Sequence, residues 1–381
     1  MAVDPAPMAQ SWLAKRTKAL ERSLIEQIFN LAATLEDKID LSIGQPHFDV
    51  PQPIKEAACQ AIVAGRNRYS QSEGIDELRS RLREQIRQEY LGDDREVMIT
   101  CGSNGALTLS MLALIDPGDQ VILFDPWFVV YDPLVRMVGG EPVYVDTYPS
   151  FRIDPDRVAR AITPRTKMII VNSPNNPTGV VATEEEVRAL AELAFQRGVL
   201  ILSDEIYRDF CFGVPFSSPG QFNPYTLVVG GFSKTYGMPG WRLGYAHGPR
   251  SIIEQMINVQ KYTFVCPPHP LQWAALTALD TDVSQRIVET HRKCDAVVEG
   301  LAGYYEFVRP TGAFYAFLRV PWGTGSEFAR YALQRYKLLV IPGRVFSTRD
   351  THFRIAFTVD DRTLEEGIRV LRELAISPPS T

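Results

Sequence analysis

Short, continuously apolar segments alternate with helical patterns through the middle of the chain. The apolar segments are residues 97–100, 121–124, 168–171, 199–202 and 227–229. Because their apolar positions are continuous rather than alternating, they are typical of strands that are buried on both faces. Helical spacing lies between them, as in Glu184–Arg197. This alternation predicts an α/β fold with a mostly parallel sheet that is covered by helices.

The pattern changes near residue 285. One long helix is followed by two aromatic-rich strands at 314–318 and 353–357, and then by a final helix from Leu364. We therefore expect a large domain over residues 51–284 and a small α+β domain over residues 285–381. The N-terminal segment 1–50, with helical spacing at 24–29 and a short strand breaking into a turn at 41–46, is expected to belong with the small domain.

Composition and charge exclude several classes of protein. The 381 residues are 45% hydrophobic and 22% charged, and the net charge is −5. These values are ordinary for a globular chain, and the acidic balance gives no general attraction for nucleic acids or acidic membranes. No apolar run approaches the roughly 18 residues of a membrane-spanning helix. The first seven residues also lack the basic-then-apolar pattern of a signal peptide.

The cysteines predict neither disulfides nor a metal site. Their number is odd, no CxxC pair occurs, and the five histidines show no paired ligand spacing. The cysteines are Cys59, Cys101, Cys211, Cys266 and Cys294. Reduced thiols in a cytoplasmic protein are the expected state.

A polar segment rich in glycine or proline follows each predicted strand. The four that carry candidate chemistry are GSNGAL (102–107), SPNNPTG (173–179), SDEIY (203–207) and SKTYGMPGWRLG (233–244). In open α/β sheets, ligands bind beyond the carboxyl ends of the strands. We therefore expect these four segments to converge on one site.

Taken together, these segments resemble the pyridoxal-phosphate-dependent aminotransferases of the aspartate aminotransferase family (class I/II, fold type I). Each motif alone is modest, but their order and spacing match over nearly the whole chain, from Leu41 to Phe357. The resemblance implies a three-layer α/β fold, pyridoxal 5'-phosphate as the cofactor, and a large domain that binds it.

Lys234 and Asp204 match the two residues that carry the family's chemistry. Lys234 matches the lysine that forms a Schiff base with the cofactor aldehyde and later moves the substrate's α-proton. Asp204 matches the carboxylate that keeps the pyridinium nitrogen protonated, so that the ring can act as an electron sink. The alternatives are a surface lysine and a helix N-cap aspartate. Glu205 is adjacent but is expected to point elsewhere.

Tyr207 and Asn176 match the pair that hydrogen-bonds the phenolic oxygen of the cofactor ring. The resemblance also places Asn176 at the substrate. A turn-forming asparagine before proline is the alternative for Asn176, and a core tyrosine is the alternative for Tyr207.

The cofactor phosphate is expected near the turn that contains Ser103 and Asn104. Arg242 matches the family's phosphate-binding arginine, whose planar fork suits a phosphate. Many members carry Ser or Thr three residues before the lysine, whereas this chain has Gly231. Ser233 directly precedes the lysine and is the remaining hydroxyl candidate.

Ring stacking and substrate binding are assigned in the same way. Phe128 matches the aromatic residue that stacks on the pyridine ring, with Trp127 as the competitor if the register slips by one. Arg354 matches the arginine that binds the substrate α-carboxylate bidentately, and Gly44 matches a backbone contact to that carboxylate. His47, where the family usually has an acidic or polar residue, is either a pH-sensitive substrate contact or, as we prefer, a solvent-facing side chain.

Tyr69 matches a tyrosine that reaches the phosphate of a neighbouring subunit, and a surface-loop tyrosine is the alternative. The match implies a homodimer with shared active sites. The substrates implied are an amino acid and a 2-oxo acid, with no nucleic acid or membrane as a partner.

The leading interpretation is an aminotransferase that acts through a Lys234 Schiff base. Lyases that cleave β-substituents or carbon–sulfur bonds, and cyclising synthases, reuse the same scaffold residues and are the main alternative. A non-catalytic regulator is disfavoured because every essential position is filled, and a dehydrogenase because no GxGxxG follows the first strand. A dicarboxylate substrate needs a second cation, for which Arg66, Arg68 and Lys261 are available. We expect broad 2-oxo acid specificity.

Overall fold

The computed structural model describes residues 12–18, 35 and 37–377. A seven-stranded sheet, with strand order β2-β8-β7-β6-β5-β3-β4, forms its centre. The strands are β2 (Arg95–Thr100), β3 (Gln120–Asp125), β4 (Glu141–Asp146), β5 (Thr166–Asn172), β6 (Leu200–Asp204), β7 (Leu227–Gly231) and β8 (Gly244–Pro249). The helical pattern at 24–29 lies outside the described residues.

Strand direction agrees with the predicted mostly parallel sheet. The five strands from β4 to β7 are parallel to their neighbours, and only β8 runs antiparallel, between β7 and β2. All five predicted strands are present. β4 and β8 were not predicted. β4 is an edge strand with mostly half-exposed residues, and β8 contains two glycines and a histidine. Neither carries the continuous apolar run that marks a doubly buried strand.

Helices cover both faces of this sheet. Alternate residues of β3 belong to different apolar clusters: Val121 and Leu123 pack with α6 and α10, whereas Ile122 packs with α9. This period of two is expected of a strand buried on both sides. The helices of this part are α4 (Gln52–Val63), α5 (Asp76–Glu89), α6 (Gly102–Leu114), α7 (Tyr131–Met137), α8 (Pro155–Ala161), α9 (Glu184–Arg197), α10 (Arg250–Thr263) and α11 (His269–Leu279). The α/β class with three layers is confirmed.

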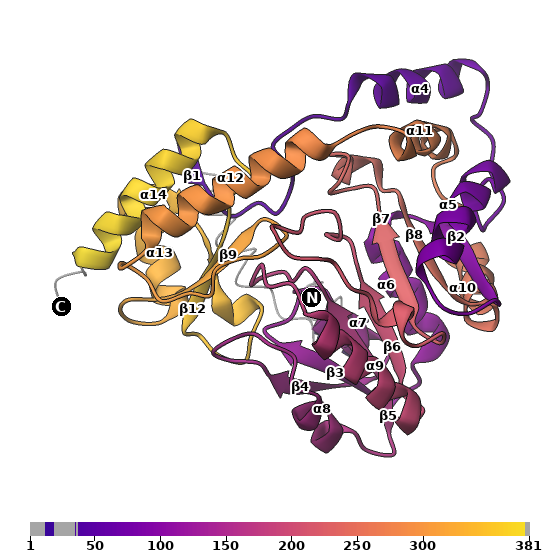
Figure 1. Ribbon diagram of the computed structural model, residues 1–381, viewed down its shortest axis with the longest axis horizontal. Helices are drawn as coiled ribbons and strands as arrows, with labels where there is room; N and C mark the ends of the chain where they lie inside the picture. Colours follow the sequence, from indigo (N-terminus) through magenta and orange to yellow (C-terminus); the bar gives the residue numbers. More distant parts are fainter. Residues whose placement is uncertain (1–11, 19–34, 36, 378–381) are drawn as a thin grey trace, which may run out of the picture.

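A second, smaller unit lies at the left of Figure 1, away from α4, α5 and α11. Its antiparallel sheet has the order β11-β12-β9. The elements are α12 (Ser284–Leu301), β9 (Tyr315–Arg319), α13 (Gly325–Tyr336), β10 (Leu338–Leu339), β11 (Ile341–Pro342), β12 (His352–Ala356) and α14 (Asp361–Ile376). Apolar side chains from these elements form one large core cluster.

The N-terminal segment contacts this smaller unit. β1 (Ile39–Asp40) pairs in parallel with β10, and Leu41 is fully buried in the same core cluster. The strand expected at 41–46 is therefore wrong in its position. The strand ends at Asp40, because the residues after it leave the sheet edge and line a cavity. The domain boundaries at residues 50 and 285 stay a prediction.

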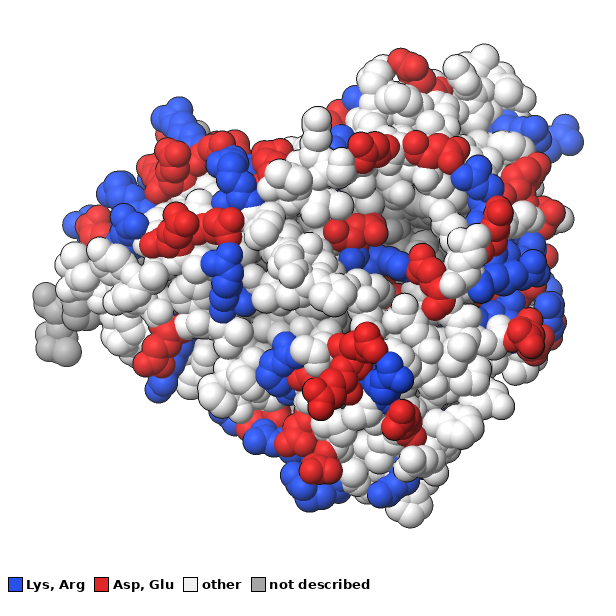
Figure 2. All heavy atoms as spheres, in the orientation of Figure 1, with Lys and Arg blue, Asp and Glu red and all other residues white. Residues whose placement is uncertain are grey.

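Within the described ranges, no helix is long and apolar enough to cross a membrane, and no group of acidic, histidine or cysteine side chains could hold a metal. All five cysteines are free thiols. On the face drawn in Figure 2, acidic and basic side chains are interspersed rather than segregated. This face therefore shows no large surface of a single charge.

Candidate active site

A cavity of about 310 Å³ lies between the carboxyl ends of β5, β6 and β7 and the small sheet. It gathers all the predicted site residues except Tyr69. The predicted residues in its lining are Gly44, Ser103, Asn104, Phe128, Asn176, Asp204, Tyr207, Ser233, Lys234, Arg242 and Arg354. Segments far apart in the sequence therefore converge at the strand ends, as α/β topology requires.

Lys234 lies three residues beyond the end of β7. Its Nζ donates a hydrogen bond to the carbonyl oxygen of Gly44 at 2.6 Å. Burial, reinforced by the nearby cations Arg354 and Arg242, lowers the pKa of the Lys234 amine to about 8, against the opposing effect of Asp204. At mildly alkaline pH, a large share of this amine is therefore neutral and able to act as a nucleophile or a base.

Asp204 is the last residue of β6 and is 2% exposed. Its Oδ2 accepts a hydrogen bond from the hydroxyl of Tyr131 at 2.7 Å, and its Oδ1 accepts one from the backbone of Ile206 at 3.3 Å. Burial raises the pKa of this carboxyl to about 6. A carboxyl held in this way is stabilised in its ionised form by a cationic partner. Asp204 caps no helix among the described residues, which disfavours the N-cap alternative.

Glu205 faces away from the cavity, as expected. Its Oε2 accepts a hydrogen bond from the hydroxyl of Tyr90 at 2.6 Å, and its Oε1 accepts one from Ser218. The two neighbouring carboxylates therefore have separate surroundings, and only Asp204 lines the cavity.

Arg354, on β12, is buried at the small-sheet side of the cavity. Its Nη2 donates to the carbonyl oxygen of Ser42 at 2.6 Å, and its Nη1 donates to Oδ1 of Asn176 at 2.9 Å. Its Nε is buried without a hydrogen-bond partner. The guanidinium lies 4.6 Å from the ring centre of Tyr315 and 4.8 Å from that of Phe346. It is thus a fixed, incompletely satisfied cation that suits a carboxylate ligand.

Tyr207 and Asn176 are both positioned by other residues of the lining. The hydroxyls of Tyr207 and Tyr315 are 2.8 Å apart. The backbone nitrogen of Asn176 donates to Oδ1 of Asn172 at 2.8 Å, and Asn172 Nδ2 donates to the carbonyl oxygen of Asp204 at 3.0 Å. Asn172 therefore links the asparagine turn to the end of β6.

The N-terminus of α6 forms a cradle for an anion. Gly102 has φ +74°, and a Cβ built there would lie 2.7 Å from Nη2 of Arg242. A Cβ at Gly244 would lie 2.7 Å from the backbone nitrogen of Ser103. Both glycines thus allow Arg242 and the backbone to approach the helix end, where N–H groups favour negative charge.

Position 231 does not contribute to this cradle. Gly231 is absent from the cavity lining, and a Cβ at this position would lie 3.0 Å from Cδ1 of Ile206. Ser233, which does line the cavity, is the hydroxyl available from this segment.

The adjacent aromatic residues Phe128 and Trp127 lie in different surroundings. Phe128 lines the cavity, edge-to-face with Tyr131 at 5.5 Å between ring centres. Trp127 instead stacks on Tyr144 at 4.5 Å and belongs to the core beneath the sheet. Phe128, rather than Trp127, therefore lines the cavity.

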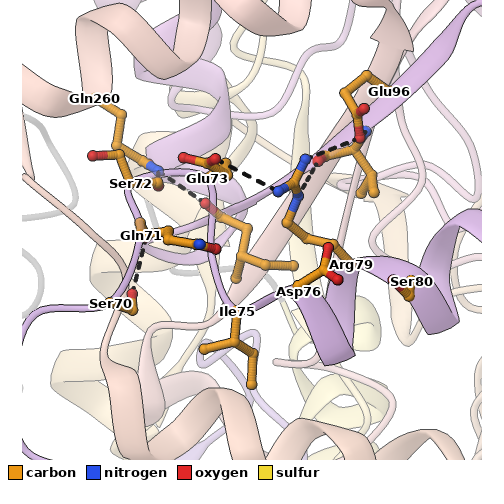
Figure 3. Close-up of polar contacts among 12 residues, drawn as sticks. Ser70, Gln71, Ser72, Glu73, Ile75, Asp76, Arg79, Ser80, Glu96 and Gln260 are labelled. Atoms are coloured by element: carbon orange, nitrogen blue, oxygen red, sulfur yellow. Dashed lines mark hydrogen bonds and ion pairs between the residues drawn. The ribbon is translucent and has the colours of Figure 1, made fainter.

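Tyr69 lies outside the cavity and is 83% exposed. The loop that follows it is held firmly. Gln272 Oε1 accepts from the backbone of Ile75 at 2.8 Å, and Gln260 donates to the carbonyl oxygens of Ser72 and Ile99. Figure 3 shows Gln260 directed at this loop and Arg79 between two glutamates. Tyr69 is therefore presented outward by an anchored loop.

His47 is not in the lining. Its Nε2 lies 3.1 Å from Oε1 of Glu289 and 3.0 Å from Nζ of Lys293, both on α12. Burial and the Lys293 cation lower the pKa of His47. His47 is exposed and outside the cavity, as preferred from the sequence. It also connects the N-terminal segment to the small unit, a contact that the sequence did not indicate.

Sequence reasoning missed several residues of the site. Those that contact the predicted residues are Ser42, Tyr131, Asn172, Tyr315 and Phe346. A signal existed for two of them: Tyr131 ends the aromatic segment after β3, and Asn172 directly precedes SPNNPTG. Tyr315 and Phe346 lie in apolar runs that look like ordinary core.

The residues present fit pyridoxal phosphate. The α6 cradle with Arg242 suits its phosphate, the Asp204 carboxylate suits a protonated ring nitrogen, and the Lys234 amine suits its aldehyde. Phe128 offers a ring face in the same cavity. The cavity thus offers a counterpart for the phosphate, the ring nitrogen, the aldehyde and the ring face of that cofactor.

The chain is similar to known aminotransferases in both sequence and structure. The family model for aminotransferase class I and II matches residues 36–371. A probable aspartate aminotransferase of Methanocaldococcus jannaschii is 36% identical, over 95% of this chain and 99% of its own length. The aspartate/prephenate aminotransferase of Thermus thermophilus is 37% identical, over 93% and 97%. A solved aspartate aminotransferase from Thermotoga maritima superposes with a TM-score of 0.92 at 32% identity, covering 96% and 100% of the two chains.

Proposed function

Because the chain belongs to the class I and II aminotransferase family and is an enzyme that transfers amino groups, we propose that it moves an amino group between an L-amino acid and a 2-oxo acid through Lys234. The observation that carries this proposal is the single cavity that holds Lys234, Asp204 and Arg354 beside the α6 anion cradle. The lyase and synthase alternatives are not favoured, because the relatives are named as aminotransferases.

Pyridoxal phosphate, when bound, supplies an electrophilic aldehyde and an electron-withdrawing ring. Its phosphate would be held by Arg242, Ser233 and the backbone at Ser103 and Asn104. Asp204, oriented by the Tyr131 hydroxyl, would stabilise a protonated ring nitrogen. Tyr207 and Asn176 are the donors available to the ring's phenolic oxygen, and Phe128 the available stacking surface.

The remaining groups act on the substrate. Arg354, held by Ser42 and Asn176, binds the α-carboxylate, and the backbone at Gly44 lies beside Lys234. The Lys234 amine, whose pKa of about 8 leaves it partly neutral, would accept the proton from the substrate's α-carbon and deliver it to the carbon of the cofactor's aldehyde group, so that the amino group stays with the cofactor. One amine therefore serves in both attachment and proton movement.

The proposal is tested by measuring which product receives the amino group. Purified enzyme with pyridoxal phosphate, a panel of L-amino acids and 2-oxoglutarate is expected to form glutamate and the donor's 2-oxo acid in equal amounts. Ammonia should stay at the level of a no-enzyme control. Release of ammonia and pyruvate from donors with a leaving group, in the absence of any 2-oxo acid, would instead establish a lyase.

A homodimer with shared sites is part of the proposal. It is supported by the anchored, outward-facing Tyr69 and by exposed apolar side chains such as Tyr262 and Val265 on the described surface. Light scattering should give twice the chain's mass. Replacing Tyr69 with phenylalanine removes one hydrogen bond to a charged phosphate and should weaken cofactor binding about tenfold.

The matched control for that variant is Tyr225→Phe, which removes the hydroxyl of another exposed tyrosine, stacked on Phe195. It should leave the dissociation constant of pyridoxal phosphate unchanged. A monomer in solution, or equal cofactor binding by both variants, would contradict the shared-site proposal.

We also propose a cytoplasmic location, supported by five free thiols. Burial raises the pKa of Cys101, Cys211 and Cys294, so these thiols are poorly reactive. Amino acids and 2-oxo acids are the proposed partners.

A further inference from the structure

We propose that the side chain of the substrate binds against an apolar wall beside Arg354, so that the enzyme prefers amino donors with apolar or aromatic side chains to dicarboxylic ones. This inference rests on the proposed function and specifies its substrate class. It narrows the broad specificity expected from the sequence.

Each cationic side chain of the cavity already has a binding partner in the proposed function. Among the described residues that line it, the cationic side chains are Lys234, Arg242 and Arg354. In the proposed function, the cofactor occupies the first two and the α-carboxylate occupies the third. A second carboxylate on the substrate would therefore find no cation of its own in this lining.

The other candidate cations lie elsewhere. Arg66 packs over the ring of Trp273 at 4.2 Å, on the surface. Lys261 is exposed, with its Nζ 3.2 Å from Oδ1 of Asn258, and Arg68 is also exposed. None of the three lines the cavity of its own subunit. Arg66 and Arg68 lie beside Tyr69, in the loop that the proposed dimer presents to its partner, so a cation supplied by the partner subunit is the source that a preference for aspartate would reveal.

The surface beside Arg354 is apolar. Ile341 is its register partner across β11 and β12, and the ring of Phe346 lies 4.8 Å from its guanidinium. Val129 packs against the same cluster as these two and also lines the cavity. Ile43 follows Ser42, whose carbonyl oxygen accepts from Arg354, and it is 41% exposed at the cavity.

The physical consequence is a preference in favour of apolar side chains. An apolar side chain placed on these residues gains from the removal of both surfaces from water. A carboxylate placed there loses its hydration without an ion pair. Each methylene-sized difference in such a pocket changes kcat/KM by roughly tenfold or more. We therefore expect L-phenylalanine and L-leucine to exceed L-aspartate and L-glutamate by at least about tenfold in kcat/KM.

The test uses the holoenzyme with one donor at a time, and follows the visible absorbance of the bound cofactor in single turnovers. A higher second-order rate constant for phenylalanine than for aspartate is the expected result. A higher constant for aspartate or glutamate would overturn the inference while leaving the aminotransferase intact. No reaction with any donor would overturn the proposed function, and this inference with it.

A binding measurement gives a second, independent readout. The unreactive acids 3-phenylpropanoate and succinate can be titrated into the holoenzyme while its absorbance is followed. The inference predicts that 3-phenylpropanoate binds about tenfold more tightly. Tighter binding of succinate would contradict it, whatever the turnover.

A substitution can introduce a cation for the second carboxylate of a dicarboxylic donor. Ile43→Lys, at a partly exposed position, should raise the aspartate-to-phenylalanine ratio of kcat/KM about tenfold. Ile43→Gln, of similar length but neutral, is the matched control and should change this ratio much less. Equal ratios for the two variants would contradict the placement of the substrate side chain on this wall.

Discussion

Lys234→Ala abolishes amino transfer: we expect kcat to fall by about 10⁴-fold or more, since general acid–base catalysis alone contributes up to about that factor. The substitution removes the amine that lies 2.6 Å from the Gly44 carbonyl oxygen in the buried cavity. It also removes the only described lysine in the cavity lining. The measurements are initial rates with the best donor and the visible absorbance after addition of pyridoxal phosphate.

Two controls separate chemistry from folding. Lys261→Ala removes an exposed lysine outside the cavity and should retain both rate and absorbance. Lys234→Arg retains a cation but not an amine that is neutral near pH 8, and should be as inactive as the alanine variant. Residual turnover within tenfold of the unmodified enzyme in either Lys234 variant would disprove the assignment.

Asp204→Asn gives the second largest loss. The substitution retains the shape of the side chain but removes the negative charge that stabilises a cationic ring nitrogen. Loss of one such preorganised interaction costs about 10²- to 10³-fold in kcat. We expect this fall in single-turnover rate, with pyridoxal phosphate still bound through the α6 cradle and Lys234.

The neighbouring carboxylate provides the comparison. Glu205→Gln alters a side chain that faces Tyr90 and Ser218 rather than the cavity. It should leave the absorbance of the bound cofactor and its pH dependence unchanged, even where stability falls. Tyr131→Phe removes the hydroxyl bonded to Asp204. Its single-turnover rate should lie between those of Asp204→Asn and Glu205→Gln. An Asp204→Asn variant with normal rates would exclude the proposed contact.

Much of the fold could be predicted from the hydrophobic pattern. The five doubly buried strands carry continuous apolar runs, and α9 begins and ends where its spacing predicts. The comparisons confirm fold type I, which the order of the motifs implied. β4 and β8 were not predicted, because β4 is an edge strand and β8 contains glycines, and neither has a continuous apolar run.

The site was predictable where one residue type is chemically required. Few other residue types can serve as a nucleophilic amine, a buried carboxylate or a carboxylate-binding cation. The residues predicted for these roles, Lys234, Asp204 and Arg354, line one cavity. The supporting groups were less visible. Tyr315 and Phe346 flank Arg354 through ring contacts that depend on tertiary structure. Tyr69 depends on a second subunit, which one chain does not contain.

The role of Lys234 is tested most directly by locating the cofactor's covalent attachment. The holoenzyme would be reduced with borohydride and digested, and its peptides would be sequenced by mass spectrometry. We expect one modified peptide, with the cofactor's mass on Lys234, and no such peptide after prior conversion with an amino donor. Attachment to another lysine, or no attachment at all, would contradict this role of Lys234.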